Sequence, residues 1–189
     1  MNFIMNFSWK ITVTAFLFAL GMCGMSYWQW TRYLEKEKFL KVLDSRLHAE
    51  IAPLSHYIPA LKSNPESVQH YRVLLQGEWD FDHEIIKRNR RDDSDGPGVH
   101  IITPLRLPES NEAVLVDRGY IPLSMQDQEK RSIFRQNAPK SFVGLLKVTE
   151  KPRSWFSPND PPSGKPHPWV DRWLRIDIDK IQKQVPYEL

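Results

Sequence analysis

An uncharged stretch near the N-terminus constrains this chain more than any other feature. No Asp, Glu, Lys or Arg occurs from Ile11 to Trp30, and Lys10 and Arg32 bound the stretch. A helix of about 20 residues is about 30 Å long, which matches the hydrocarbon thickness of a bilayer. Aromatic side chains typical of membrane interfaces lie at both ends, namely Trp9, Tyr27, Trp28 and Trp30. The pattern predicts a transmembrane helix over residues 11–30, within an N-terminal segment of residues 1–30.

Three other interpretations of this stretch are weaker. A cleaved signal peptide has an apolar core of about 7–15 residues followed by small residues, whereas this stretch is longer and ends in aromatic residues. A lipoprotein site would use Cys23, but Met22 stands where a small residue is expected. A buried core helix would need a larger domain to enclose it. The sequence therefore favours an uncleaved membrane anchor.

The charges beside the stretch give an orientation of their own. Lys10 lies on the N-terminal side, and the other side carries Arg32, Lys36, Lys38 and Lys41. A positive-inside count alone places the large C-terminal part in the cytoplasm.

Residues 31–65 are expected to form a helical extension and a connector. Phe39, Leu40, Leu43 and Leu47 fall on one helical face, so the membrane helix is predicted to continue and to end before Pro53. Three prolines, at Pro53, Pro59 and Pro65, then indicate a connector into the following domain.

Residues 66–189 have the pattern of a β-rich domain. Apolar residues alternate after Gly98, and a second β-branched run ends at Pro122, which predicts two strands with a turn between them. Further strands are expected at 68–79, bending at Gly77, and at 84–88, 140–149 and 173–178, before a short helix at 179–184 capped by Asp177. The predicted class is α+β, with a transmembrane helix followed by a mainly antiparallel, open barrel-like domain that carries short helices.

Several functional classes are disfavoured. A net charge of +3 is too small to indicate nucleic-acid binding, and the single cysteine excludes an internal disulfide framework. The sequence contains no H-x-x-x-H pair, G-x-S-x-G motif or glycine-rich phosphate loop. We expect a binding role without catalytic or metal-ligating residues. The alternatives are an enzyme that uses His83 or His100 beside a carboxylate in a concave pocket, and an adaptor that binds a protein through exposed edge strands.

The basic run from Lys87 to Arg91 has two interpretations. It is followed directly by Asp92, Asp93 and Asp95, which is typical of a solvated loop. An anion contact, to a propionate or a lipid headgroup, is the alternative.

Short motifs follow one another along the chain in a fixed order. Their positions are Trp28, Gln29, Arg32, Lys36, Gly77, Gly98, Thr103, Pro104, Arg118, Gly119, Pro122, Gly144, Pro158, Asn159 and Asp177. Together these motifs resemble the surfeit-locus (SURF) family of cytochrome c oxidase assembly proteins. In two places the sequence departs from the family pattern, because Val99 stands one position early and Tyr120 replaces a tryptophan.

The resemblance implies a non-enzymatic assembly factor that helps to insert haem a into, or to protect it in, subunit I of cytochrome c oxidase. Its partners would be membrane lipid, subunit I and the haem-insertion machinery, and haem a is a possible cofactor. The resemblance also implies a domain on the periplasmic or intermembrane-space side, which overrides the charge count because long domains translocate largely regardless of charge. Without an Arg/Ser-rich transit segment, a bacterial inner membrane is the expected location rather than a mitochondrial one.

The resemblance leaves two matters open. Relatives close with a second membrane helix, and no second apolar segment occurs up to Leu189, so we expect either a fragment or a member with one anchor. The haem-linked histidine of some bacterial relatives lies in that second helix, so no cofactor-binding residue is predicted here. Arg118 is expected either to order the strand pair or to contact the partner.

Overall fold

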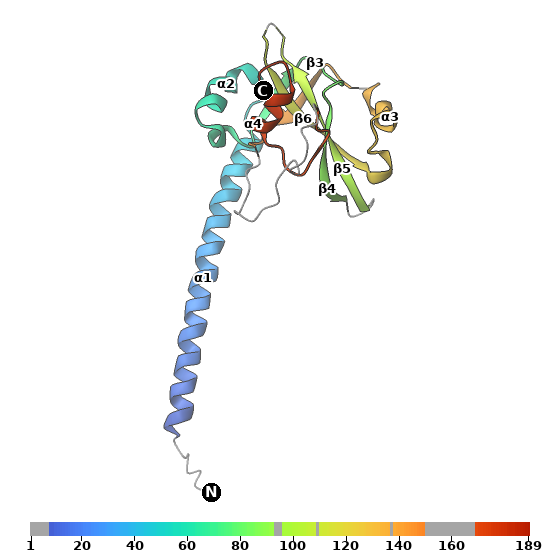
Figure 1. Ribbon diagram of the computed structural model, residues 1–189. Helices are drawn as coiled ribbons and strands as arrows, with labels where there is room; N and C mark the ends of the chain where they lie inside the picture. The colour runs from blue at the N-terminus through green and yellow to red at the C-terminus, as the bar shows by residue number, and fades with distance from the viewer. Residues whose placement is uncertain (1–7, 93–95, 109, 137, 150–168) are drawn as a thin grey trace. The chain divides into compact units, whose positions relative to one another are not determined.

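The computed structural model describes residues 8–92, 96–108, 110–136, 138–149 and 169–189 (Figure 1). The chain forms two compact units, one up to Ala49 and one from Glu50 to Leu189. The motif positions Pro158 and Asn159 lie outside the described residues.

The first unit contains one long helix, α1 (Trp9–Leu47). It includes an apolar segment that is long enough to cross a membrane by length and composition, and none of its residues is buried within the structure. The hydroxyl groups of Thr12 and Thr14 donate to the carbonyls of Ser8 and Lys10, so they have acceptors within the helix itself. The prediction of a long N-terminal apolar helix is confirmed, and a buried core helix is not what the structure shows.

Within the expected connector, residues 54–63 form helix α2 (Leu54–Ser63), which the sequence analysis did not predict and which contains Pro59. Leu54 is buried, and Tyr57, Ile58 and Leu61 pack against the same core cluster at helical spacing. This apolar face stabilises a short helix despite the backbone donor that a proline lacks. A 3-10 turn, η1 (Pro65–Val68), follows.

The second unit is built on two sheets. The smaller has the order β1-β2-β7, with β1 (Ala52–Pro53), β2 (Arg72–Gln76) and β7 (Ser141–Leu145). The larger has the order β3-β5-β4-β8, and β6 also pairs with β5. Its strands are β3 (Glu78–Trp79), β4 (Ile85–Asp92), β5 (Gly96–Arg106), β6 (Ala113–Pro122) and β8 (Arg172–Trp173). All pairings are antiparallel except β1 with β2 and β4 with β8. The α+β class and the open, mainly antiparallel sheet are confirmed.

The chain passes from one sheet to the other at Gly77, between β2 and β3. A Cβ atom at this position would lie 2.2 Å from the carbonyl oxygen of Arg106, so only glycine lets the two backbones approach. The predicted bend at Gly77 is therefore a change of sheet.

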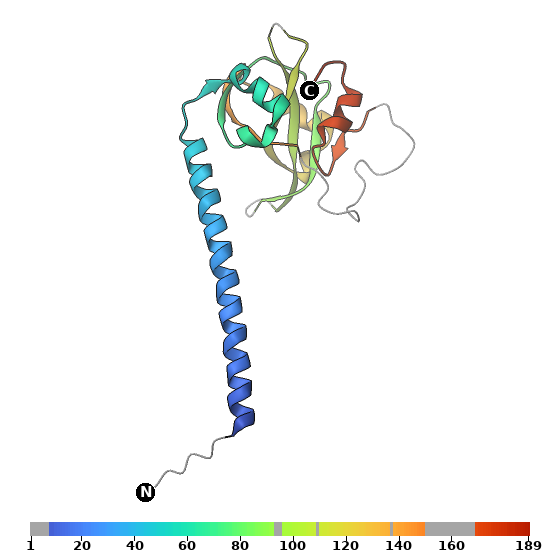
Figure 2. The ribbon, with the colours of Figure 1, turned by 90° about the vertical axis from the view of Figure 1, so that its left-hand side faces the viewer.

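The short helices lie on both sides of the sheets. Between β6 and β7 the chain forms η2 (Leu123–Met125), α3 (Gln128–Arg131) and η3 (Ser132–Arg135). After β8 come α4 (Ile178–Ile181) and η4 (Gln182–Gln184). The views in Figures 1 and 2 place α2 and α3 on opposite sides of this unit.

Three expectations for this unit are corrected. The basic run at 87–91 belongs to strand β4 rather than to a solvated loop, and Lys87 is buried. The strand expected over 173–178 is limited to Arg172–Trp173. Asp177 occupies the N-cap position of α4, but its side chain makes no capping hydrogen bond; its backbone carbonyl accepts the N–H groups of Lys180 and Ile181.

Candidate functional site

A β-bulge in β6 positions Arg118. Ile101 pairs with Gly119 and Ile102 pairs with Asp117, so Arg118 has no partner residue on β5. Gly119 adopts a φ of 110°, which favours glycine, and its N–H donates to Asp117 Oδ1 at 3.0 Å. Such a bulge breaks the alternation of side chains along a strand. Asp117 remains exposed, whereas the side chain of Arg118 is 13% exposed and contacts Glu84.

Glu84 is the buried centre of this site. Its carboxylate is shielded completely from solvent, and Thr103 Oγ1 donates to Oε2 at 3.1 Å. Arg118 Nη1 lies 3.4 Å from the same oxygen. Two further arginines face Oε1, with Arg131 Nε at 2.9 Å and Arg135 Nη2 at 3.7 Å. A buried carboxylate is stable only when cations and donors surround it, and this one has both.

The arginines also connect the α3 segment to the sheets. Arg131 Nη2 donates to Asp171 Oδ1 at 2.6 Å, and Arg131 Nη1 donates to the Gln126 carbonyl at 3.3 Å. Arg118 Nη2 donates to the carbonyl of Phe134. Polar contacts from β6 and from the residues directly before β4 and β8 therefore hold the segment from η2 to η3 in place.

The cluster carries an excess of positive charge among the described residues. Three guanidinium groups, of Arg118, Arg131 and Arg135, face two carboxylates, of Glu84 and Asp171. Burial lowers the pKa of Arg118, Glu84 acts in the opposite direction, and repulsion by Arg135 lowers it further. A guanidinium remains charged in such surroundings, so the excess is permanent.

Aromatic rings cover these cations. The guanidinium of Arg118 lies 5.3 Å from the centroid of Trp79 and 5.4 Å from that of Phe81. Arg135 lies 5.5 Å from the Phe81 ring, and Trp79 stacks on Phe142 at 5.3 Å on the β7 side. Cation–π contact stabilises guanidinium groups that have lost part of their hydration.

A groove of about 560 Å³ adjoins the same aromatic residues. Asp80 lies within it and accepts from His83 Nδ1 at 2.7 Å and from the Tyr187 hydroxyl at 3.0 Å, while its other oxygen accepts the N–H groups of Asp82 and His83. The groove is lined by Glu78, Trp79, Asp80, Phe81, Asp82, His83, Arg106, Asn111, Pro186 and Tyr187.

Burial and the hydrogen bonds in the groove shift the pKa values of Asp80 and Tyr187. Burial alone would raise the pKa of Asp80, but the bonds from His83 and Tyr187 outweigh burial and lower it. Burial and the bond to Asp80 raise the pKa of Tyr187. Asp80 is therefore ionised and Tyr187 protonated near neutral pH.

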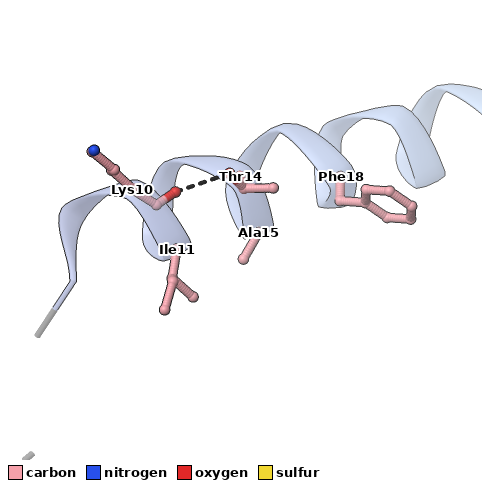
Figure 3. A pocket seen from close by; sticks show the side chains of 5 residues that line it. All are labelled: Lys10, Ile11, Thr14, Ala15 and Phe18. Atoms are coloured by element: carbon pink, nitrogen blue, oxygen red, sulfur yellow. Dashed lines mark hydrogen bonds between the residues drawn. The ribbon is translucent and has the colours of Figure 1, made fainter.

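A second hollow lies on α1 and has no such construction. It is formed by Lys10, Ile11, Thr14, Ala15 and Phe18 of a single helix face, and the Thr14 hydroxyl is bonded to the Lys10 carbonyl (Figure 3). Among the described residues no group of three or more His, Cys, Asp or Glu side chains could hold a metal ion.

Among known protein families, the model of the SURF1 family matches residues 16–188 of this chain. The chain belongs to the SURF1 family. A SURF1-like protein from Monosiga brevicollis is 28% identical over 167 residues, covering 82% of this chain and 59% of that protein. Surfeit locus protein 1 from Mus musculus is 27% identical over 195 residues, covering 96% of this chain and 58% of that protein.

A third SURF1 relative gives the same picture. Surfeit locus protein 1 from Homo sapiens is 25% identical over 165 residues, covering 80% of this chain and 51% of that protein. The chain thus spans less than two thirds of the length of these relatives. No solved structure gives a significant match.

The structure brings together only part of the motif positions predicted from the SURF resemblance. Thr103 and Arg118 contact Glu84, and Gly119 belongs to the bulge that positions Arg118. Gly98 pairs with Pro122, and a Cβ atom at Gly98 would lie 2.3 Å from the Tyr120 ring, so two motifs of the family contact each other there. The remaining described motif positions are not part of the cluster. Gly77 lies at the change of sheet, Pro104 is buried in β5, and Gly144 lies in β7. Asp177 precedes α4, and α1 carries Trp28, Gln29, Arg32 and Lys36. On α1, Arg32 lies 5.5 Å from the Trp28 ring.

Sequence reasoning missed Glu84, its partners Arg131 and Arg135, and Asp171, which pairs with Arg131. Two signals were present. Glu84 directly precedes Ile85 and Ile86 at the start of a buried strand, and Arg131 and Arg135 stand four residues apart. Neither signal distinguishes a buried ion cluster from a solvated surface without tertiary structure.

Proposed function

We propose that this protein is a membrane-anchored, non-enzymatic assembly factor for cytochrome c oxidase, which assists haem a insertion or stabilises subunit I. Membership of the SURF1 family over residues 16–188 carries the proposal. An N-terminal helix able to cross a membrane supports it. The partners proposed are membrane lipid, subunit I and the haem-insertion machinery.

The Glu84 cluster suits a binding role better than a chemical one. Its carboxylate is fully shielded from solvent and faces Thr103 and three guanidinium groups, so a ligand cannot reach it for proton transfer. Its effect is to fix the η2-to-η3 segment on the sheet, which presents a defined surface to a partner. We assign this surface a positioning role in assembly.

The groove beside His83 does not fit a haem. The groove beside His83 is bordered by the carboxylates of Glu78, Asp80 and Asp82 against the single guanidinium of Arg106, which would repel the propionates of a haem. We therefore place no haem-binding residue in this part of the chain, and the proposed assistance to haem a insertion acts through protein contacts.

Deletion of the gene tests the assembly function. We expect the deletion strain to lose most of its haem a absorbance and oxidase activity in isolated membranes, and the full-length gene to restore both. Unchanged haem a content and oxidase activity in the deletion strain would contradict the proposal.

The compartment proposed is the periplasmic side of a bacterial inner membrane, with the mitochondrial inner membrane as the competing location. In spheroplasts, added protease should digest the unit that begins at Glu50 while α1 stays with the membrane. Protection of that unit in intact spheroplasts, with digestion after lysis, would place it in the cytoplasm instead.

A second function is favoured by one observation, the His83–Asp80 pair in a concave groove. Such a pair can orient a histidine as a general base. The groove is lined by no serine or cysteine among the described residues, so an enzyme of this kind would activate water or a bound hydroxyl. The variant His83→Ala separates the two functions, because an assembly factor should retain oxidase maturation and an enzyme should not.

A further inference from the structure

Arg135 has an unused binding edge. Its Nε and Nη2 atoms are buried and have no hydrogen-bond acceptor among the described residues, and Nη2 approaches Glu84 Oε1 only to 3.7 Å. These two atoms form the side-on edge of a guanidinium, which binds both oxygens of a carboxylate at once. A buried donor without an acceptor is unfavourable, so an acceptor brought to this edge would be stabilising.

The charges around Arg135 specify how much negative charge would be accommodated. Three guanidinium groups face two carboxylates, which leaves one positive charge. Of the two acids in the segment from η2 to η3, Glu129 is exposed, and Asp127 already lies 3.2 Å from Lys130 and 3.8 Å from Arg172. One carboxylate would balance the cluster, whereas a dianionic phosphate would reverse its charge.

Apolar side chains beside Arg135 indicate the source of that carboxylate. Ile133 and Phe134 belong to the same 3-10 turn, and they are 54% and 37% exposed. Exposed apolar residues around an arginine are typical of the centre of a protein–protein interface. A free small anion would not need such a border.

We propose that Arg135 receives the carboxylate of an acidic side chain from a protein partner, with Ile133 and Phe134 as the flanking apolar contacts. Because the free edge is shielded from solvent, the carboxylate enters as the partner displaces the neighbouring side chains of η3. This inference rests on the proposed function only in that the domain binds a protein.

The first test uses the purified full-length chain in detergent with phenylacetate as the carboxylate probe. Phenylacetate should raise the thermal unfolding midpoint in a saturable manner, and neutral phenylacetamide at equal ionic strength should not. The variant Arg135→Gln should weaken the apparent affinity about tenfold or more, since it removes a charge-assisted pair. Arg135→Lys keeps the charge but not the planar edge and should give an intermediate loss.

The matched control is Lys130→Gln on the neighbouring helix, which should leave the affinity for phenylacetate unchanged because Lys130 is exposed and paired with Asp127. Should Arg135→Gln fail to fold, Arg135→Lys alone carries the test. Equal responses of wild type and Arg135→Lys, or Arg135-dependent binding of inorganic phosphate or of vesicles of anionic lipid in place of phenylacetate, would overturn the proposal.

The second test identifies the source. A photo-crosslinker in place of Ile133 should capture a partner protein in native membranes at a site containing Asp or Glu. Capture should fall about tenfold or more with Arg135→Gln, and equally when that acid is changed to its amide. Capture independent of either change overturns the inference while leaving the assembly role intact. If gene deletion spares the oxidase but both tests succeed, the assembly role fails and the acid-binding site stands.

Discussion

Glu84 and Asp80 lie four positions apart before strand β4, and the fold stabilises their two carboxylates in different ways. Glu84 is surrounded by permanent cations, Arg118, Arg131 and Arg135, together with the hydroxyl of Thr103. Asp80 is held by a histidine, a tyrosine hydroxyl and two backbone N–H groups at the edge of a groove. The first carboxylate is held mainly by neighbouring charges, whereas the second is held by four hydrogen bonds.

The difference shows which of the two sites is built for stability and which for response. The three guanidinium groups around Glu84 keep their charge across the physiological range. The Asp80 site faces a groove, so a ligand that enters can change its hydrogen bonds, and the lowered pKa of Asp80 makes its contribution to stability depend on pH. Four substitutions that lower the unfolding free energy by decreasing amounts test this distinction.

Glu84→Gln should have the largest effect. It leaves three guanidinium groups, of which that of Arg131 is buried, with one carboxylate. Breaking a buried ion pair by removing one partner costs about 3–5 kcal/mol. Chemical denaturation of the purified chain measures the loss in unfolding free energy. The exposed Glu78→Gln is the matched control and should change it by less than about 0.5 kcal/mol. A loss for Glu84→Gln no greater than that of the control would show that the cluster does not stabilise the domain.

Arg118→Ala should follow, with a loss of about 2–4 kcal/mol in unfolding free energy, since it removes the contact to Glu84, the bond to the Phe134 carbonyl and the ring contacts. Oxidase maturation is measured separately in cells. A variant that folds normally but fails in maturation would assign Arg118 to the partner contact, and parallel losses of both would assign it to the strand pair.

Asp80→Asn should cost about 1–2 kcal/mol at about pH 7, because a charged acceptor of several hydrogen bonds becomes neutral. The folded-state pKa of Asp80 lies below its ordinary value of 3.8, so its contribution is present above about pH 4 and is lost as the pH falls through the folded pKa. Wild type should therefore lose stability on acidification, and Asp80→Asn should lose less. Equal acid sensitivity of the two proteins would remove Asp80 from this account.

Thr103→Val should have the smallest effect, about 0.5–1.5 kcal/mol, because it removes one hydrogen bond to Glu84 at nearly constant volume. The loss should be the same at about pH 5 and about pH 8, since no partner of Glu84 titrates between them. A loss that varied with pH would show that the stability contributed by the Glu84 cluster depends on pH, as that of the Asp80 site does.

The parts of the fold that were predictable depend on neighbours along the chain. The β5–β6 pair followed from alternation around Val99 and Ile101, and the turn residues between the strands are local. The long apolar helix followed from the absence of charge. Gly77 was expected to bend a strand because glycine is unusual there, and its close approach to Arg106 explains that residue choice.

The unpredicted parts depend on residues that are distant in sequence. Helix α2 was missed because Pro59 indicates a break, and only its packing against Val73 and Leu75 explains why the helix persists. The Glu84 cluster was missed because a single glutamate is usually exposed, and its arginines come from β6, α3 and η3. The bulge that positions Arg118 was visible only as an Arg-Gly pair.

Trp79 and Phe81 border the groove on one side and contact Arg118 and Arg135 on the other. A molecule that shifts these rings from the His83 side therefore changes the environment of both guanidinium groups. Thermodynamic linkage makes this influence mutual. A ligand in the groove and a carboxylate bound at Arg135 would therefore change each other's affinity by the same factor.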